Sequence, residues 1–202
     1  VIILHLYASN SITMDTLLNE LCLVVIGISV AFLVNFYMPS MDQELVEYKN
    51  KIENLYRIIL KELSEYLVTG NSIWTGKEII EADNAIKKAV YYAALDLENH
   101  ITGSEDSYYH YFKLRERQLA ILKRILPLAG KMDLSEHEGS REIGEFIGHL
   151  SDNVHHRNTT EEHIKQLEEL LENLKKKEIP SNFEEFERRA ALFQLGKELK
   201  DY

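Results

Sequence analysis

An uncharged apolar run from Leu21 to Met41, LCLVVIGISVAFLVNFYMPSM, constrains this chain more than any other feature of its sequence. An α-helix rises about 1.5 Å per residue, so the run would span about 30 Å, the thickness of the hydrocarbon core of a bilayer. Tyr37 suits a membrane interface, and Pro39 interrupts the helix where water would begin. The sequence therefore predicts a transmembrane helix over residues 15–40.

Two other kinds of segment share this composition. A secretory signal needs basic residues before its apolar stretch, and residues 1–20 contain no Lys or Arg, which argues against a signal. A core helix of a soluble bundle usually keeps a polar face, whereas only Ser29 and Asn35 interrupt the apolar surface here. The core-helix alternative stays open.

Charge is distributed unevenly along the chain. There are 33 acidic and 23 basic residues, a formal net charge of −10, and every Lys and Arg lies at Lys49 or beyond. Because basic residues collect on the cytoplasmic side of membrane spans, Lys49 and Lys51 predict a cytoplasmic C-terminal part. The apolar stretch Val1–Ala8 is expected to be the remnant of an earlier membrane helix, followed by a short loop within residues 1–14. The single cysteine, Cys22, excludes a disulfide framework within one chain.

Residues 41–202 follow the 3.6-residue period of amphipathic helices, with no strand-like alternation of any length. The first helix is expected to begin at Asp42 and to end at Gly70. Its apolar face consists of Leu45, Tyr48, Ile52, Leu55, Ile59 and Tyr66. Nothing in the sequence obviously covers this stripe along its full length, so we expect the domain to form a homo-oligomer through its helices.

Two further long helices follow. The second starts near Gly76 and turns one face inward, made of Ile79, Ala82, Ile86, Ala89, Ala93 and Leu97. The third has Ser104 as its N-cap and ends at Pro127. Its predicted buried residues are Tyr108, Tyr111, Phe112, Leu119 and Leu122. Short connections make these helices antiparallel neighbours.

Three shorter helices each open on a capping pair, which are Ser135 with Glu138, Thr159 with Glu162, and Asn182 with Glu185. Their predicted inward faces are Ile143, Phe146, Ile147 and Leu150, then Ile164, Leu167, Leu171 and Leu174, then Phe183, Phe186, Ala190 and Phe193. The predicted fold class is therefore all-α, an antiparallel helical bundle over residues 41–202 preceded by a hydrophobic helix.

Four histidines, His149, His155, His156 and His163, lie near acidic residues in a composition that can bind a divalent metal. No two of them are spaced i, i+4, and the segment between residues 153 and 160 has the composition of an exposed connection. We therefore favour a solvated polar loop and expect no metal and no cofactor.

Other sites are weaker still. Aromatic and basic residues alternate from Tyr108 to Arg124, but helical spacing buries most of these aromatics and the acidic domain repels polyanions, so no nucleic-acid partner is expected. No nucleophile elbow, phosphate loop or zinc-binding helix motif occurs, which argues against an enzyme. Glu20 and Asn35 are the strongly polar residues of the apolar segment and are the candidates for a transport path.

Two stretches together resemble one protein family. They are Asn35-Phe36-Tyr37-Met38-Pro39-Ser40, which leads into the long amphipathic helix, and Phe183-Glu184-Glu185-Phe186-Glu187-Arg188-Arg189-Ala190-Ala191-Leu192-Phe193-Gln194-Leu195. Both are similar to the bacterial aromatic acid exporter family, whose members place membrane helices first and a soluble helical domain last. The resemblance implies a bacterial plasma-membrane protein that exports small aromatic carboxylic acids. It also singles out Phe183, Phe186, Arg188, Arg189 and Phe193 as a family-like closing motif.

Two functional classes follow from these observations. In the first, the chain is the C-terminal part of a transporter, and its soluble domain acts in regulation or oligomer assembly. In the second, it is a membrane-anchored helical interaction or sensory module without transport activity.

Overall fold

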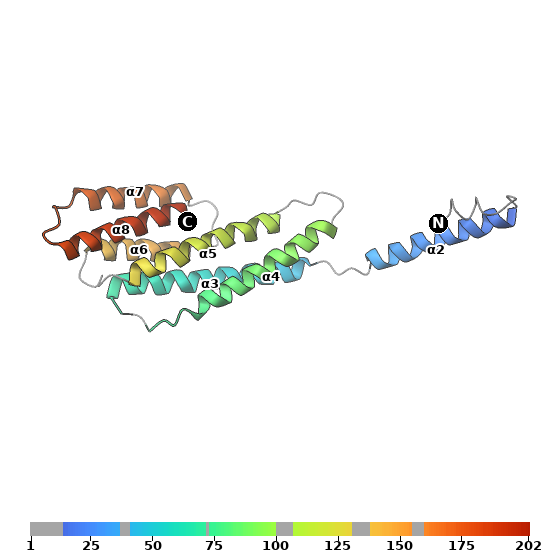
Figure 1. The fold of residues 1–202 in the computed structure, drawn as a ribbon, viewed down its shortest axis with the longest axis horizontal. Coiled ribbons are helices and arrows are strands. Elements are labelled where there is room, and N and C mark those ends of the chain that lie inside the picture. The colour runs from blue at the N-terminus through green and yellow to red at the C-terminus, as the bar shows by residue number, and fades with distance from the viewer. Residues whose placement is uncertain (1–13, 37–40, 72, 100–106, 131–137, 155–159) are drawn as a thin grey trace. The chain divides into compact units, whose positions relative to one another are not determined.

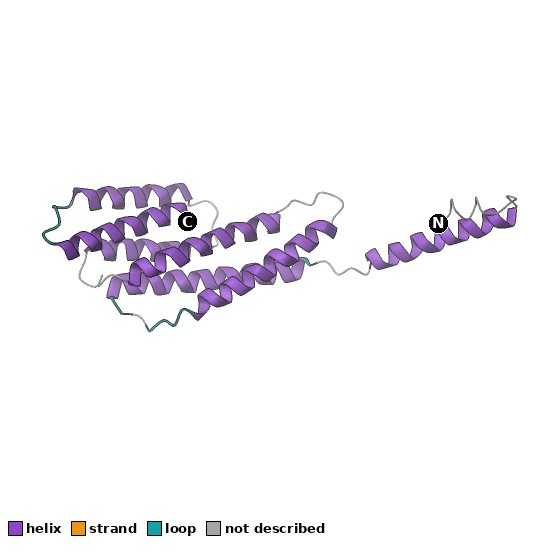
Figure 2. Ribbon diagram, viewed as in Figure 1, coloured by secondary structure: helices purple, strands orange, loops and turns teal. Residues whose placement is uncertain are grey.

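The computed structural model of the chain describes residues 14–36, 41–71, 73–99, 107–130, 138–154 and 160–202. Within these residues the chain forms seven helices and no strands (Figures 1 and 2). It divides into two compact units, Val1–Ser40 and Met41–Tyr202. The all-α prediction is confirmed.

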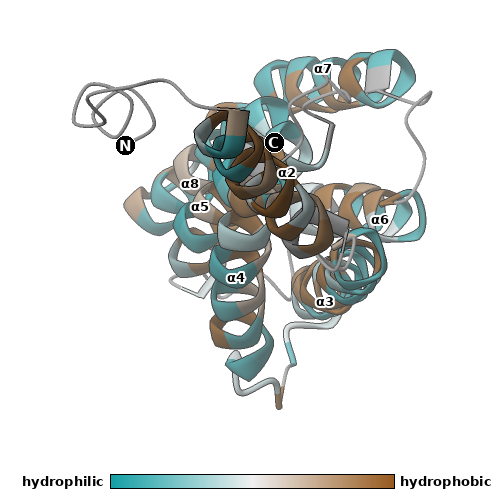
Figure 3. Cartoon of the chain, turned by 90° about the vertical axis from the view of Figure 1, so that its right-hand side faces the viewer, coloured by the Kyte–Doolittle hydropathy of each residue, from teal (hydrophilic) through white to brown (hydrophobic). Residues whose placement is uncertain are grey.

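Helix α2, Met14–Phe36, carries the predicted hydrophobic segment. Its stretch Met14–Leu33 has a mean hydropathy of 2.2, and only 6% of that stretch is buried. In Figure 3 most of the α2 ribbon is brown, the colour of hydrophobic residues. By length and composition this helix can cross a membrane. Residues 1–13 and Pro39 lie outside the described residues.

Helix α3, Asp42–Thr69, buries one face along most of its length. Gly70 ends it as predicted, with a φ of 72° and its N–H bonded to the carbonyl of Tyr66 (2.8 Å). The apolar residues of α3 that are buried are Leu45, Ile52, Leu55, Tyr56, Ile59, Leu60, Leu63 and Leu67. Helices α4, α5 and α6 all pack against it. The expectation of an uncovered stripe is therefore wrong, because a wider face of α3 is apolar and the bundle itself covers it.

Helix α6, Glu138–Asp152, approaches α3 very closely. Ser140 Oγ donates to the carbonyl of Leu67 (2.9 Å), and Ser64 Oγ donates to the carbonyl of Gly144 (2.7 Å). A Cβ atom at Gly144 would lie 2.8 Å from Cγ2 of Val68 and 3.1 Å from the carbonyl oxygen of Ser64. The contact therefore requires a residue without a side chain at position 144.

Helices α4, Lys77–Asn99, and α5, Ser107–Gly130, complete the long-helix layer. The predicted alanine face of α4 is buried, but Leu97 is 41% exposed because α4 runs at an angle to α3 and its last turns leave the shared core (Figure 1). Pro127 does not end α5, which continues to Gly130. Proline removes only one backbone donor, and the burial of Ala129 keeps the last turn packed. The predicted cap Ser104 lies outside the described residues.

Helices α7, Thr160–Lys176, and α8, Phe183–Asp201, pack against each other. Asn182 caps α8 as predicted, its Oδ1 accepting from the N–H of Glu185 (2.8 Å). The predicted inward face of α8 is wrong, since Phe183, Phe186 and Ala190 are exposed and Phe193 is half-buried. The buried residues are Leu192, Leu195, Gly196 and Leu199, which lie on nearly the opposite side of the helix at about 100° per residue. The predicted caps Ser135 and Thr159 lie outside the described residues.

The α3–α6 contact gives a first testable prediction. Gly144→Ala adds a methyl group where the opposing backbone leaves no space, so we expect the protein to lose about 1–3 kcal/mol of unfolding free energy. For a domain of this size that corresponds to a fall in Tm of about 2–4 °C per kcal/mol. Thermal unfolding followed by circular dichroism measures it. Gly130→Ala is the matched control, because a Cβ there meets nothing within 4 Å. Equal Tm values for the two variants would contradict the prediction.

Candidate functional site

A pair of buried charged side chains lies in the bundle between α3 and α5. Glu53 is 5% exposed and Arg115 is 8% exposed, although the surrounding core is mostly aliphatic. A buried charge is costly unless it is paired and hydrogen-bonded. The geometry around Arg115 meets that requirement.

Tyr111 connects the two charges. Arg115 Nε donates to Tyr111 Oη (3.0 Å), and Tyr111 Oη donates to Glu53 Oε1 (2.7 Å). Arg115 Nη2 lies 3.7 Å from the same Glu53 oxygen. Tyr111 and Arg115 are four residues apart, so one face of α5 presents both. Burial raises the pKa of Tyr111 above its usual value, and the hydroxyl therefore stays protonated as a donor at neutral pH.

The Arg115 guanidinium has further partners. It donates to Gln118 Oε1 (3.0 Å) and to the carbonyl of Val154 (2.9 Å), which follows α6. It also lies 5.1 Å from the ring centroid of Tyr111 and 5.5 Å from that of Tyr56, both within cation–π range. Tyr56 in turn donates from its hydroxyl to the backbone carbonyl of Arg115.

The end of α8 joins the same cluster. Gln118 Nε2 donates to the carbonyl oxygen of Tyr202 (2.9 Å). Burial raises the pKa of the Tyr202 hydroxyl, and the nearby charge of Arg115 acts in the opposite direction. That hydroxyl is buried without a hydrogen-bond partner among the described residues. We call these residues the Arg115 network, and its members are Glu53, Tyr56, Tyr111, Arg115, Gln118, Val154 and Tyr202.

The network can fix the positions of helices, but its members are not arranged for catalysis. Its tyrosines stay protonated, its arginine carries a permanent charge, and Glu53 accepts a hydrogen bond. It joins α3, α5, the end of α6 and the end of α8. Its chemistry is that of a positioning element between the helix that follows α2 in the chain and the last helix.

The structure describes two of the four histidines that were considered as metal ligands. His149 is exposed at the end of α6, and its carbonyl accepts from Asn153 Nδ2 (2.9 Å). His163 packs edge-on against the ring of Phe146, with centroids 6.2 Å apart. His155 and His156 lie outside the described residues. The part of the chain that the structure describes holds no group of three or more His, Cys, Asp or Glu side chains that could bind a metal.

The two candidates for a transport path lie at separate levels of α2. Glu20 is buried, unlike the apolar residues around it, and the side chain of Asn35 lies outside the described part. At 1.5 Å per residue the two positions are about 22 Å apart along the helix. The structure therefore does not bring them together, and a role for either stays a prediction.

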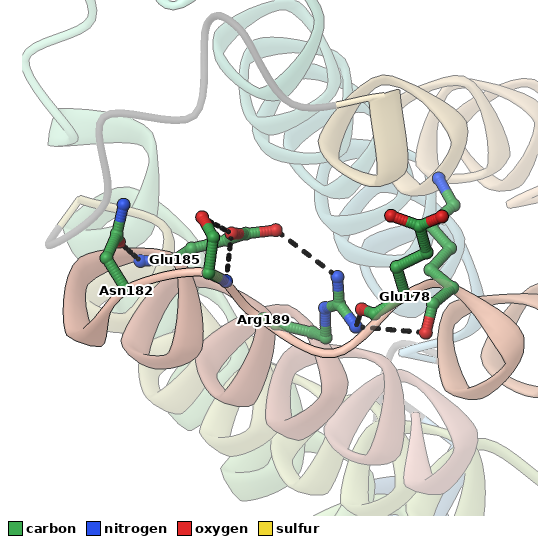
Figure 4. Close-up of polar contacts among 6 residues, drawn as sticks. Glu178, Asn182, Glu185 and Arg189 are labelled. Atoms are coloured by element: carbon green, nitrogen blue, oxygen red, sulfur yellow. Dashed lines mark hydrogen bonds and ion pairs between the residues drawn. The ribbon is translucent and has the colours of Figure 1, made fainter.

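The family-like closing motif divides into buried and exposed parts. Phe183 and Phe186 face solvent, whereas Arg188 and Arg189 are half-buried. Phe193 lies between two lysines, with Lys175 Nζ 5.5 Å and Lys197 Nζ 4.9 Å from its ring centroid. Arg189 donates to the carbonyls of Lys177 and Glu178 in the connection between α7 and α8, and to Glu185 within α8 (Figure 4).

Both parts of the chain match known sequences. Residues 42–202 match the family described as "Putative aromatic acid exporter C-terminal domain", and residues 1–38 match "Aromatic acid exporter family member 1". The chain belongs to the aromatic acid exporter family. The two matches meet where the structure changes from its first unit to its second, between Ser40 and Met41. The resemblance found in the sequence is confirmed.

The chain is also similar to a curated protein and to a solved structure. The chain is 42% identical over 202 residues to "Uncharacterized protein YqjA" of Bacillus subtilis (strain 168), covering 100% of this chain and 62% of that protein. It therefore spans less than two thirds of that relative's length. A crystal structure described as a putative membrane protein from Clostridium difficile 630 has the same fold, with a TM-score of 0.69 and 18% identity over 79% of this chain and 92% of that one.

Breaking the Arg115–Glu53 pair gives a second prediction. Arg115→Met leaves a buried carboxylate without its cation, and we expect a loss of about 3–5 kcal/mol in unfolding free energy. The double variant Arg115→Met/Glu53→Leu should lose less than the sum of the two single variants, because no lone charge remains. Arg141→Met is the control, since its pair with Glu145 is exposed and contributes less than about 1 kcal/mol. Additive losses in urea unfolding would contradict a coupled pair.

The buried tyrosines predict sensitivity to alkali. The folded-state pKa of Tyr56, Tyr111 and Tyr202 is raised above 10.0, so their contribution to stability is complete below pH 10 and is lost as the pH rises further. Urea unfolding at a series of pH values, with tyrosinate absorbance as a second signal, measures this loss. Tyr111→Phe should make the loss shallower. An unchanged pH dependence in that variant would mean that Tyr111 ionises equally in both states.

Proposed function

We propose that this chain is the C-terminal part of a membrane exporter of aromatic carboxylic acids, and that its helical domain regulates or assembles the exporter on the cytoplasmic side. The observation that carries the proposal is the place of α3. This helix begins at Asp42, six residues after the end of α2 at Phe36, and it is buried among α4, α5 and α6. A displacement of α3 must therefore disturb the whole domain.

The cytoplasmic side follows from charge. The candidate membrane helix has no Lys or Arg before it in this chain, whereas Lys49 and Lys51 follow it closely. Basic residues near the end of a span favour retention of that end in the cytoplasm. The substrate class comes from the family description and from no residue of this domain.

The Arg115 network supports a regulatory role. A buried ion pair with aromatic partners has few alternative arrangements, so it holds α3, α5 and α8 in one register. A rotation of α3 that moved Glu53 away from Tyr111 and Arg115 would leave buried charges unpaired. The domain would then respond to movement of α3 in a switch-like manner rather than gradually.

Efflux of a hydroxylated benzoate tests this function. Bacterial cells expressing the complete protein, the protein truncated after residue 40, or the Arg115→Met variant would be loaded with the compound, and its release measured. We expect full release only with the complete protein, an altered rate after truncation, and a smaller change with Arg115→Met. Matched amounts of membrane-inserted protein are the control.

Three outcomes separate the functional classes. Release that depends on the protein and on its C-terminal domain supports the proposal. Equal release by the truncated and complete proteins would contradict a regulatory or assembly role for the domain. No release by the complete protein would favour a membrane-anchored interaction or sensory module instead.

A further inference from the structure

The connection between α7 and α8 and the first turn of α8 together expose three large apolar side chains. Ile179 is 91% exposed, Phe183 is 72% exposed and Phe186 is 56% exposed. The rings of Phe183 and Phe186 lie beside each other, with centroids 6.3 Å apart. We call these three residues the hairpin tip. Neighbouring exposed apolar groups such as these two rings mark an interaction surface more often than isolated exposed residues do.

Hydrogen bonds hold the hairpin tip in place (Figure 4). Asn182 Oδ1 accepts from the N–H of Glu185 (2.8 Å), and Glu185 Oε2 accepts from both the N–H and the Oγ–H of Ser181 (2.8 Å each). Arg189 donates to the carbonyls of Lys177 (3.3 Å) and Glu178 and to Glu185 Oε1 (3.4 Å). The connection is thus fixed by polar contacts while its apolar side chains point to solvent. A surface fixed in this way loses little conformational entropy when a partner binds.

Opposite charges flank the hairpin tip. On one side lies the end of α7 with exposed Lys175 and Lys176. Lys175 is ion-paired with Glu172 (2.5 Å) one turn earlier and contacts the ring of Phe193 on that edge of α8. Glu184 and Glu187 are exposed on the edge of α8 away from Phe193. Each follows a phenylalanine of the hairpin tip by one residue, which places it about 100° further around the helix. The surface therefore runs from basic, through apolar, to acidic.

This arrangement selects among partners. An anionic lipid surface would repel the glutamates, and an acidic protein would use only the lysines. A second copy related by a two-fold axis meets both requirements, since the basic edge of each copy faces the acidic edge of the other and the apolar residues meet at the centre. The whole chain has a net charge of −10, so two copies repel each other. Association is favoured only where the contacting surfaces carry both signs of charge.

We propose that the hairpin tip is a homodimer contact, through which two copies of the C-terminal domain associate two-fold. This contact specifies where the domains would associate, and the proposal therefore rests on the assembly role in the proposed function. Phe183 and Phe186 supply the apolar centre, and the Lys175–Lys176 and Glu184–Glu187 edges supply orientation.

Cysteine cross-linking in native membranes tests the contact in the complete protein. All other cysteines, Cys22 included, would be replaced by Ser, and Ala190→Cys would be introduced on the exposed face beside the tip. We expect a short bis-maleimide to convert this variant into covalent dimers at least tenfold more efficiently than Ile80→Cys, a control at an exposed site of α4. Adding F183S/F186S should abolish the difference. The matched pair Y91S/L114S, which removes exposed apolar groups from α4 and α5, should not.

Charge exchange gives the sharper result. K175E/K176E and E184K/E187K should each reduce cross-linking severalfold, and the four substitutions together should restore it, because the flanking charges are then complementary again. Cross-linking that is unaffected by F183S/F186S, or no recovery in the fourfold variant, overturns the proposal. Efflux is measured in the same cells. If F183S/F186S loses cross-linking but exports normally, the contact exists and has no role in transport. If efflux depends on the C-terminal domain but Ala190→Cys does not cross-link, the contact is wrong and the proposed function stands.

Discussion

Close packing of α3 against α6 is the constraint on which the rest of the bundle depends. Ser140, Gly144 and Gly148 bring the two backbones near enough for side-chain hydroxyls to bond across the interface to main-chain carbonyls. With α6 seated on one side of α3, the remaining apolar faces of that helix are free for the alanines of α4 and for α5. The longest helix of the domain thus becomes its centre. The glycines are required for that arrangement because any larger residue would separate the helices.

The Arg115 network has a different energetic role from the apolar core. Desolvation of Arg115 and Glu53 costs free energy that their mutual attraction largely offsets, so the pair adds little net stability compared with a well-packed apolar pair. Its contribution is to specificity, because a helix shifted by one turn would leave a buried charge without a partner. The network involves four segments far apart in the chain, among them both the first and the last helix of the domain. It is therefore suited to keep α3 and α8 in a fixed relation.

Local chemistry predicted most of the helices, because their period and their ends depend on nearby residues. Gly70 and Asn182 end and begin helices as their sequence context predicted. The face of α8 was not predictable in this way. Its inward side begins with half-buried, polar Glu185, Arg188 and Arg189. Glu185 accepts from Ser181, and Arg189 donates to the carbonyls of Lys177 and Glu178 in the α7–α8 connection, so the aromatic residues that dominate the pattern are left outside. Glu53 was missed for a related reason, since periodicity assigns a carboxylate to solvent unless its partner, 62 positions further on, is known. The i, i+4 pair of Tyr111 and Arg115 was the one local sign of the network.

Two exposed apolar surfaces in this chain call for different surroundings. Helix α2 is apolar around almost its whole circumference, and a bilayer covers such a surface without requiring any particular orientation. The hairpin tip is small, its backbone is fixed by Asn182, Glu185 and Arg189, and charges of opposite sign lie on its two edges. Lipid cannot use a fixed shape with both signs of charge, whereas a folded protein surface can. In the exporter that we propose, the first surface would anchor the chain in the bilayer and the second would orient two copies of the soluble domain.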